Sequence, residues 1–223
     1  MRGHKGGKAY KFRCDSIAYF TDSPFTLTEF NINEVLFRDW LEGDVLTFAM
    51  AEHFPTVGAP TTVVSSYFAG CPTELGSRYF ALVDFAKHEL LFIPVEAARH
   101  WSLLAWGVAT EKLYSMDSGR SLLFAHSNIK YEPAIALIET LINRSPLFGA
   151  AALTRSPIRL ETAVQPNGVD CGFHVVLNAK SLAEHVCEQW WGHRHLGPPV
   201  SGVREVNAFR RDLGRRCLQL PLA

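Results

Sequence analysis

The middle of the chain carries apolar runs whose lengths are typical of strands. Residues 89–95 (ELLFIPV) and 101–109 (WSLLAWGVA) are almost entirely apolar, and residues 112–117 (KLYSMD) alternate between polar and apolar positions. Continuous apolar runs are typical of a sheet that is covered on both faces. We therefore expect a central sheet, to which residues 158–164 (IRLETAV) add one more strand.

Four other segments place apolar residues at helical spacing. They are residues 40–54, which end before Pro55, then Glu132–Arg144, a helix that begins at Cys171, and residues 202–218. The last helix is expected to turn one side inward, formed by Val203, Val206, Phe209, Leu213 and Cys217. Because helices and strands are mixed without strict alternation, the predicted fold class is α+β, with a central mixed sheet flanked by helices.

The first part of the chain differs in character from the middle. Its first dozen residues carry three glycines and four Lys or Arg residues, so we expect a flexible basic arm over residues 1–15. From Ser16 to Asn33, short apolar stretches alternate with Asp, Ser, Pro and Thr, which indicates small strands and turns. No linker is visible beyond this point, and the length suits one large domain, so we expect a single domain over residues 16–223.

Composition narrows the classes of partner. Lys plus Arg and Asp plus Glu both number 22, so the formal net charge is zero. Binding to nucleic acid by bulk attraction to phosphate is not expected, because it needs an excess of positive charge. No run of about 20 apolar residues suggests a membrane span, and residues 1–13 lack the apolar stretch of a secretory signal. We expect a monomer that works inside the cell, in the cytosol or nucleus.

The cysteines suit a reducing compartment. There are five, an odd number at wide spacing, and no C-x-x-C pair that would indicate a zinc ribbon or a thioredoxin-like motif. Cys187, His193 and His195 lie close together, but their spacing matches no metal site. We therefore expect no metal and no other cofactor.

Three short stretches carry candidate chemistry. His100-Trp-Ser-Leu-Leu opens a predicted strand, Met-Asp117-Ser ends the next strand, and Gln165-Pro-Asn-Gly-Val-Asp-Cys171-Gly172 runs into a helix. A thiol attacks only as the thiolate, and the N–H groups and positive potential of a helix N-terminus favour that form. Cys171 is therefore a candidate nucleophile, and we expect Gly172 to let a substrate backbone approach it closely.

A thiolate nucleophile needs a base and a group that orients the base. His100 and Asp117 lie at the ends of consecutive strands that should pair as a hairpin, which can bring the two side chains within hydrogen-bond reach. The side-chain amide of Gln165 could point at the developing oxyanion. Each residue alone has an ordinary structural explanation, since a cysteine at a helix start is more often a small buried hydrophobe. The order and spacing of all four favour catalysis.

These motifs resemble those of the Ulp1-like cysteine proteases, which cleave ubiquitin-like modifiers after a C-terminal Gly-Gly. The order His, Asp, Gln, Cys is that group's signature and differs from papain, in which the cysteine comes first. The resemblance covers about residues 16–218 and implies an Ulp1/adenain-like fold with the nucleophile at a helix N-terminus. The stretch Ile17-Ala-Tyr-Phe-Thr-Asp-Ser is similar to the strand that opens the compact deneddylase members, so the resemblance favours NEDD8 as the modifier. SUMO and ubiquitin stay open as alternatives.

The resemblance also implies substrate-binding residues. Trp101 and Trp40 should roof a narrow tunnel for the Gly-Gly tail, since only glycines pass between two indoles. The family segment Trp-Leu-Asn-Asp is matched in this chain by Trp40-Leu-Glu-Gly-Asp44, so the substrate-contacting Asp is missing at its place or displaced to Asp44. Two other functions remain possible on this fold. One is an acyltransferase that uses acetyl-coenzyme A, against which Trp101 argues, and the other is an inactive module that binds the modifier.

Overall fold

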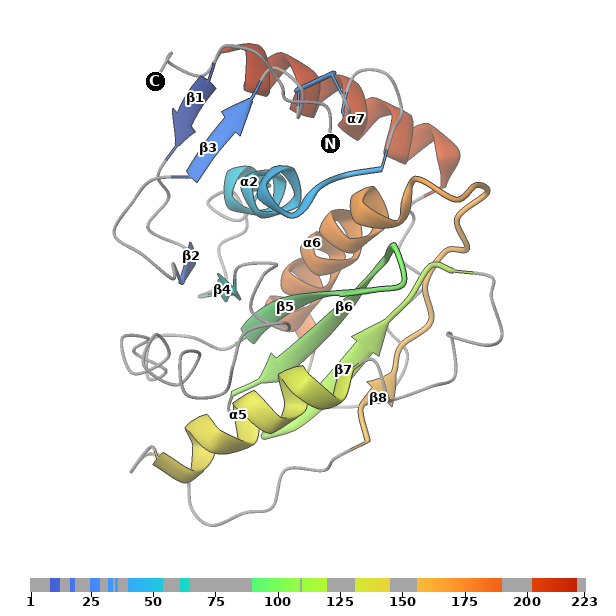
Figure 1. The fold of residues 1–223 in the computed structure, drawn as a ribbon. Coiled ribbons are helices and arrows are strands. Elements are labelled where there is room, and N and C mark those ends of the chain that lie inside the picture. Colours follow the sequence, from blue (N-terminus) through green and yellow to red (C-terminus); the bar gives the residue numbers. More distant parts are fainter. Residues whose placement is uncertain are drawn as a thin grey trace.

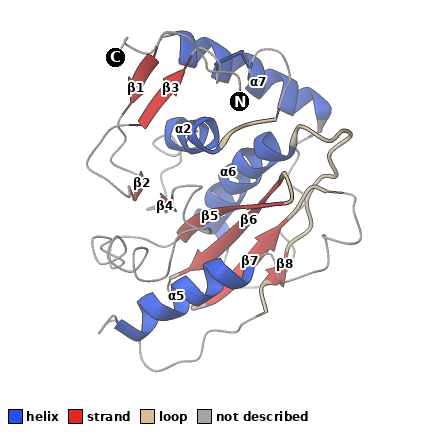
Figure 2. Cartoon of the chain, in the orientation of Figure 1, coloured by secondary structure: helices blue, strands red, loops and turns tan. Residues whose placement is uncertain are grey.

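The structure is a computed structural model that describes residues 9–12, 17–18, 25–28, 32–33, 35, 40–53, 61–64, 90–108, 110–119, 131–144, 156–189 and 202–219. Its strands are β1 (Ala9–Phe12), β2 (Ile17–Ala18), β3 (Phe25–Thr28), β4 (Thr61–Val64), β5 (Leu90–Ala97), β6 (His100–Gly107), β7 (Lys112–Met116) and β8 (Ile158–Arg159). Its helices are α2 (Gly43–His53), α5 (Glu132–Arg144), α6 (Cys171–Gln189) and α7 (Val203–Leu218). Figure 1 shows their arrangement, and Figure 2 separates helices from strands.

The largest sheet has six strands in the order β2-β4-β5-β6-β7-β8. The three central strands pair antiparallel, whereas β2 with β4, β4 with β5 and β7 with β8 pair parallel. A separate antiparallel pair joins β1 to β3. The predicted α+β class with a central mixed sheet flanked by helices is confirmed.

The two faces of the central sheet are both buried, as the apolar runs predicted. Alternate residues such as Leu90 and Phe92 share one core with residues of α2 and α6. Their neighbours Leu91 and Ile93 face the other way and are equally buried. Helix α5 crosses in front of the strands, and α6 runs behind them (Figure 1). The central hairpin is therefore packed on both faces at the point where the candidate site is built.

Several predictions from the sequence need correction at the ends of elements. Residues 9–12 pair with β3, so the flexible-arm interpretation does not hold for these four, whose Tyr-Lys-Phe alternation suits an edge strand. The strand expected over 158–164 is only two residues long, because the chain then leaves the ladder and keeps single backbone bonds to β7 and the residues after it. Val203, expected to point inward, is 51% exposed at the first position of α7. The short strand β4 was not expected.

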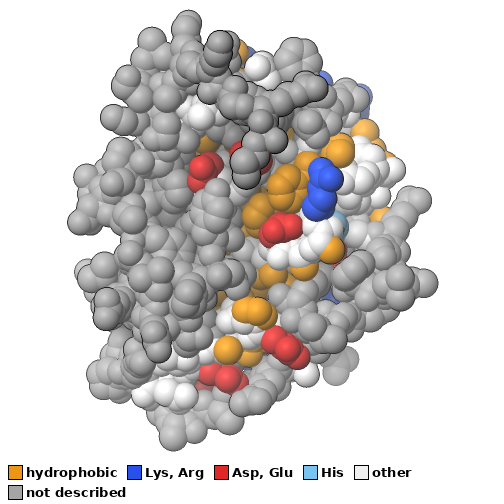
Figure 3. Space-filling model, in the orientation of Figure 1, with side chains coloured by type: hydrophobic (Ala, Val, Ile, Leu, Met, Phe, Trp, Pro, Cys, Tyr) orange, Lys and Arg blue, Asp and Glu red, His pale blue; other side chains and the backbone are white. Residues whose placement is uncertain are grey.

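The described surface carries both apolar and charged side chains. On the face drawn in Figure 3, apolar side chains of the described residues form a band with acidic and basic side chains beside it. None of the described helices is long and apolar enough to cross a membrane. The loop that contains His193 and His195 lies outside the described residues, as does the side chain of Cys187.

Candidate active site

His100 is held by a tight turn between two central strands. It opens β6 and pairs with Ala97, the last residue of β5. The two residues between them, Ala98 and Arg99, have φ angles of 50° and 60°. Positive φ at both central positions is the geometry of a type I′ hairpin, which matches the twist of the flanking strands. The turn therefore fixes the position at which the imidazole leaves the sheet.

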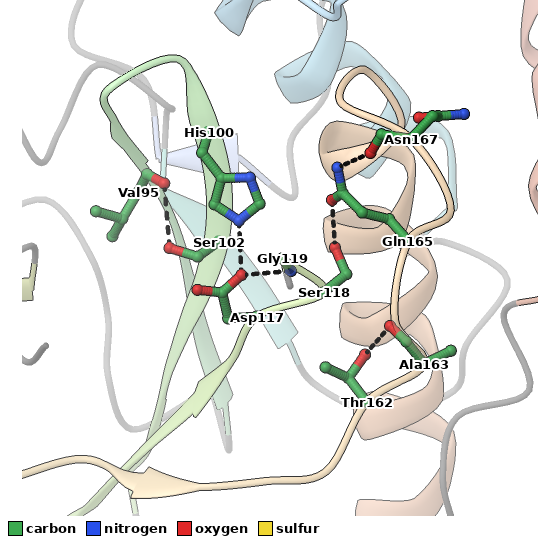
Figure 4. A network of polar contacts seen from close by, with 10 residues as sticks. All are labelled: Val95, His100, Ser102, Asp117, Ser118, Gly119, Thr162, Ala163, Gln165 and Asn167. Carbon is green, nitrogen blue, oxygen red and sulfur yellow. Dashed lines mark hydrogen bonds and ion pairs between the residues drawn. The ribbon is translucent and has the colours of Figure 1, made fainter. Parts of the chain in front are cut away.

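His100 and Asp117 meet as the sequence predicted. Strands β6 and β7 pair antiparallel, so the first residue of β6 and the last residue of β7 lie at the same end of the sheet. The Nε2 atom of His100 lies 2.6 Å from Oδ1 of Asp117 (Figure 4). This hydrogen bond is the largest cause that raises the pKa of His100 from 6.5 to about 9, a second cause being its hydrogen bond to Cys171, while burial opposes both. The imidazole is therefore protonated at neutral pH and lies beside the candidate nucleophile.

The carboxylate of Asp117 is itself oriented by the residue two places further on. The backbone N–H of Gly119 donates to Oδ1 of Asp117 at 2.9 Å, the same oxygen that contacts His100. A Cβ atom at position 119 would lie 2.9 Å from Nε2 of His100 and 3.2 Å from Oδ1 of Asp117. The chain thus passes so close to the His–Asp pair that only glycine fits without a shift.

Gln165 is tied to the same end of the sheet. Its backbone N–H donates to the carbonyl of Ser118 at 2.8 Å, and its side-chain oxygen accepts a bond from the Ser118 hydroxyl at 2.9 Å (Figure 4). Its side-chain nitrogen donates to the carbonyl of Asn167. An amide nitrogen carries two hydrogens, so one remains to serve as a donor elsewhere. The arrangement can orient that second N–H toward an oxyanion.

Cys171 is the first residue of α6, as predicted, and is buried. It lies at the positive end of this helix, and its proximity is one of the causes that raise the pKa of His100. At Gly172 the close neighbour of an added Cβ would be the Leu41 side chain, and the expected approach of a substrate backbone there stays a prediction. A Cβ at position 172 would lie 3.1 Å from Leu41 Cβ. Glycine at this position lets the segment before α2 pack against the nucleophile helix.

The two expected substrate-binding tryptophans lie together beside that segment. The indole rings of Trp40 and Trp101 stack with centroids 5.4 Å apart and an angle of 15° between their planes. Trp101 is buried and its Nε1 donates to the carbonyl of Leu41 at 2.7 Å. Leu41 therefore links the tryptophan pair to Gly172, next to the candidate nucleophile. Their role in holding a Gly-Gly tail stays a prediction.

Asp44 has a position that a structural role alone can explain. It is half-buried in the first turn of α2, where a carboxylate is favoured by the positive end of the helix. This position explains the residue without a substrate, and its contact with the modifier stays a prediction. Among the described residues, no group of three or more His, Cys, Asp or Glu side chains could hold a metal ion.

Reasoning from sequence missed three residues that support the site. Ser118 anchors Gln165, Gly119 orients Asp117, and Arg210 of α7 forms a buried ion pair with Asp170, the residue before Cys171. Ser118 and Gly119 directly follow Asp117, a candidate from the sequence, and this adjacency is the signal that points to them. The sequence gives no such signal for Arg210, because it is one of several arginines on a helix with an amphipathic pattern.

A cysteine at a helix start, a histidine hydrogen-bonded to a carboxylate and a neighbouring amide are the groups that a cysteine peptidase uses. A family model described as the Ulp1 protease family, C-terminal catalytic domain, matches residues 59–190, which is more than half of the chain. The chain therefore belongs to the Ulp1 protease family. The matched stretch contains His100, Asp117, Gln165 and Cys171. A comparison with curated proteins finds no match.

Solved structures share the fold at low sequence identity. The C-terminal Ulp1 protease domain in complex with Smt3, the yeast ortholog of SUMO, is 18% identical with a TM-score of 0.71, and the match covers 96% of this chain and 89% of that one. A structure described as the de-sumoylating protease is 17% identical with a TM-score of 0.68, covering 95% and 90%. The Xanthomonas campestris effector XopD bound to ubiquitin is 19% identical with a TM-score of 0.58, covering 79% and 91%.

Proposed function

We propose that this peptidase cleaves after the C-terminal Gly-Gly of a ubiquitin-like modifier, either to process its precursor or to release it from target lysines. In this proposal Cys171 is the nucleophile. The observation that carries it is the His100–Asp117 hydrogen bond of 2.6 Å, and Cys171 is a further cause of the raised pKa of the same imidazole. Family membership supports the same chemistry.

The proposed reaction has two halves. The Cys171 thiolate attacks the carbonyl carbon of the last glycine, and the C–S bond forms while the carbonyl oxygen becomes an oxyanion that accepts a hydrogen bond from Gln165. The C–N bond then breaks, and the leaving amine takes a proton from the His100 imidazolium. Water next attacks the thioester while His100 takes its proton. The C–S bond breaks, releasing the modifier's carboxylate and restoring the thiolate.

The tryptophan pair supports selection of a Gly-Gly tail. Stacked indoles at a centroid distance of 5.4 Å leave no layer between them, because an inserted peptide needs roughly 3.5–4 Å on each of its two sides. A tail between the rings would therefore have to part Trp40 from Trp101, and any side chain on the tail would widen the gap that is needed. A modifier whose tail is changed to Ala-Ala should be a poor substrate for this reason.

We propose NEDD8 as the favoured modifier, on the sequence resemblance over Ile17–Ser23 to the compact deneddylases. SUMO is the second candidate, because the structures that share the fold include Ulp1 with Smt3 and a de-sumoylating protease. Ubiquitin is the third, in line with the structure of XopD bound to ubiquitin. These likenesses concern fold, so the choice of modifier must be measured.

A panel of NEDD8, SUMO and ubiquitin, each bearing a fluorogenic amide at its C-terminal glycine, tests the proposal. We expect release of the fluorophore from at least one modifier, with the highest kcat/KM for NEDD8, and none with Cys171→Ala. The matched control is the same modifier ending in Ala-Ala. The proposal fails if wild type cleaves none of the three modifiers, or if Cys171→Ala cleaves as fast as wild type.

Two further reagents, labelled acetyl-coenzyme A and a modifier with a C-terminal electrophile, separate the two alternatives. An acyltransferase would take label from acetyl-coenzyme A onto Cys171 and cleave no modifier. An inactive binding module would hold a modifier without reacting with a C-terminal electrophile on it. A protease of the proposed kind gives covalent labelling at Cys171 by the electrophilic modifier, together with turnover of the fluorogenic one.

A further inference from the structure

Arg210 is a buried arginine that joins the last helix to the nucleophile turn. It lies on α7, outside the stretch matched by the family model, and is only 5% exposed. Its Nη2 donates to Oδ1 of Asp170, and its Nη1 donates to the carbonyl of Val35 at 3.3 Å. Its guanidinium also lies 4.1 Å from the centre of the Phe173 ring. The side chain is therefore held on three sides.

Hydrogen bonds continue from this arginine to Gln165. The other oxygen of Asp170 accepts a bond of 2.8 Å from the side-chain nitrogen of Asn167. The side-chain oxygen of Asn167 accepts the backbone N–H groups of Val169 and Asp170, both at 3.0 Å. The backbone carbonyl of Asn167 then accepts the bond from the Gln165 side chain. An unbroken path thus runs from α7 to the amide proposed as oxyanion donor.

The exposed part of the turn depends on this path for its shape. Pro166, Asn167 and Gly168 are exposed, so packing does not hold them. Asp170 is buried, and its carboxylate connects the turn to the core through a charge. A buried charge that loses its partner is costly, which makes the geometry of such a pair well defined. Arg210 therefore sets where Asp170 lies, and Asp170 sets where Asn167 presents its carbonyl.

We propose that Arg210 is a positioning residue that acts through Asp170 and Asn167 to aim the side chain of Gln165 at the oxyanion. The inference rests on the role proposed for Gln165. Lysine cannot replace arginine at this position, because its ammonium is a single point charge that lacks the planar fork and stacks poorly on an aromatic ring. The substitution Arg210→Lys keeps the positive charge beside Asp170 and removes this geometry.

Two small electrophiles separate positioning of Gln165 from reactivity of the thiol. With p-nitrophenyl acetate, the thiolate attacks the acetyl carbonyl, an oxyanion forms, and the C–O bond breaks to release p-nitrophenolate. With chloroacetamide, the thiolate displaces chloride at a saturated carbon, where a C–S bond forms, a C–Cl bond breaks and no oxyanion appears. Both reactions are followed on the full chain at Cys171, so they do not depend on which modifier is cleaved.

The variants are Arg210→Lys, Asn167→Ala and each of these combined with Gln165→Ala. We expect Arg210→Lys and Asn167→Ala to slow acylation at least about tenfold, because small errors in the position of a catalytic group are costly, while alkylation stays within about twofold. In the Gln165→Ala background neither change should slow acylation further, since groups that act as one unit are not additive. Arg211→Met, an exposed neighbour on α7, is the matched control and should react like wild type.

Three results overturn the proposal: unchanged acylation, equal loss in both reactions, or losses that multiply with Gln165→Ala. If Arg210→Lys shows no cooperative unfolding transition, Asn167→Ala decides alone, because its side chain lies in an exposed turn and leaves the buried pair intact. Failure of the wild type to cleave any modifier would refute the proposed substrate and leave this comparison of electrophiles valid.

Discussion

Nε2 of His100 and Oδ1 of Asp117 lie 2.6 Å apart, and this contact determines which ring nitrogen serves the nucleophile. When Nε2 donates to the carboxylate, Nδ1 is the nitrogen left to exchange a proton with Cys171. The bond joins the first residue of β6 to the residue just after β7, two strands paired along most of their length. The sheet therefore selects both the orientation of the imidazole and its tautomer.

Replacing Asp117 by Asn should show how much kcat depends on that tautomer. The Asn side chain can donate to Nε2 and so favour the wrong tautomer, and we expect kcat to fall by about 10⁴-fold. His100→Ala should do comparable damage, and Cys171→Ala should remove turnover. The measurement is cleavage of the fluorogenic modifier, with circular dichroism to show that each variant is folded. An Asp117→Asn enzyme with nearly normal kcat would refute the role assigned to this carboxylate.

The raised pKa of His100 predicts how activity depends on pH. Its pKa is about 9 in the folded protein against 6.5 for an ordinary histidine. Because His100 must be protonated to give a proton to the leaving amine, kcat should fall as the pH rises through about 9. The check is a pH profile of kcat for the fluorogenic modifier. An alkaline limb centred near pH 6.5 would contradict the environment found for this histidine.

The same shift predicts a dependence of stability on pH. A folded-state pKa above the unfolded value means that protonation stabilises the folded form. This contribution is complete below about pH 6.5 and is lost as the pH rises from there through about 9. Wild type should therefore lose stability relative to His100→Ala over that window. Denaturant melts of both proteins at several pH values provide the measurement, and a constant difference would argue against the shift.

Removing the Gln165 side chain tests the oxyanion donor. Gln165→Ala should lower kcat by about 10²–10³-fold if one of its N–H groups meets the developing oxyanion. The KM should change little, because the bond strengthens in the transition state. Ser118→Ala is a useful companion, since it removes only the hydroxyl that holds the amide oxygen. Full activity of Gln165→Ala would reduce the residue to a structural part of the turn.

The candidate catalytic residues could be found from the sequence because each lies at the boundary of a regular element. His100 opens an apolar run, Asp117 closes an alternating one, and Cys171 starts a helical pattern, so local periodicity placed all three. Because β6 and β7 are consecutive and joined by a short loop, their antiparallel pairing could also be expected. This is the kind of contact that a single sequence reveals most readily.

The supporting contacts could not be found that way because they join distant segments. Arg210 lies 40 residues from Asp170, and Ser118 lies 47 residues from Gln165. Nothing in the spacing of one segment specifies a partner in the other. The close packing of Leu41 against Gly172 was missed for the same reason, since Leu41 comes from a segment far earlier in the chain. Short strands such as β1 and β4 were missed because four residues carry little periodicity.

The tight approach at Gly119 predicts an active-site defect from one added methyl group. The Cβ of Gly119→Ala would lie 2.9 Å from His100 Nε2, so the imidazole or the turn must move. We expect kcat to fall roughly 10²-fold, since a shift of about 1 Å can cost that much. Gly168→Ala is the matched control, because nothing lies within 4 Å of a Cβ there. Equal, near-normal activity of the two variants would show that the His–Asp pair tolerates the shift.

Changes in the turn before His100 should raise the stability of the protein and leave its activity unchanged. Ala98 and Arg99 hold φ angles of 50° and 60°, a region that disfavours residues with a Cβ, whereas Asn-Gly suits two positive φ angles well. The double change Ala98→Asn and Arg99→Gly should therefore raise the free energy of unfolding by about 1 kcal/mol. The bond from the backbone N–H of residue 99 to Glu96 is retained.

Denaturant unfolding measures this gain, and Arg99→Lys serves as the control because it keeps the strained φ. The kcat of the double variant should stay near that of wild type, since the course of the backbone into His100 is unchanged. Glu111, at the other end of the β6–β7 hairpin, has a φ of 54°, so Glu111→Gly should give a smaller gain of the same origin. A loss of stability in the double variant would mean that the turn does not hold both residues at positive φ. The type I′ geometry of this turn would then not be what positions the His100 imidazole.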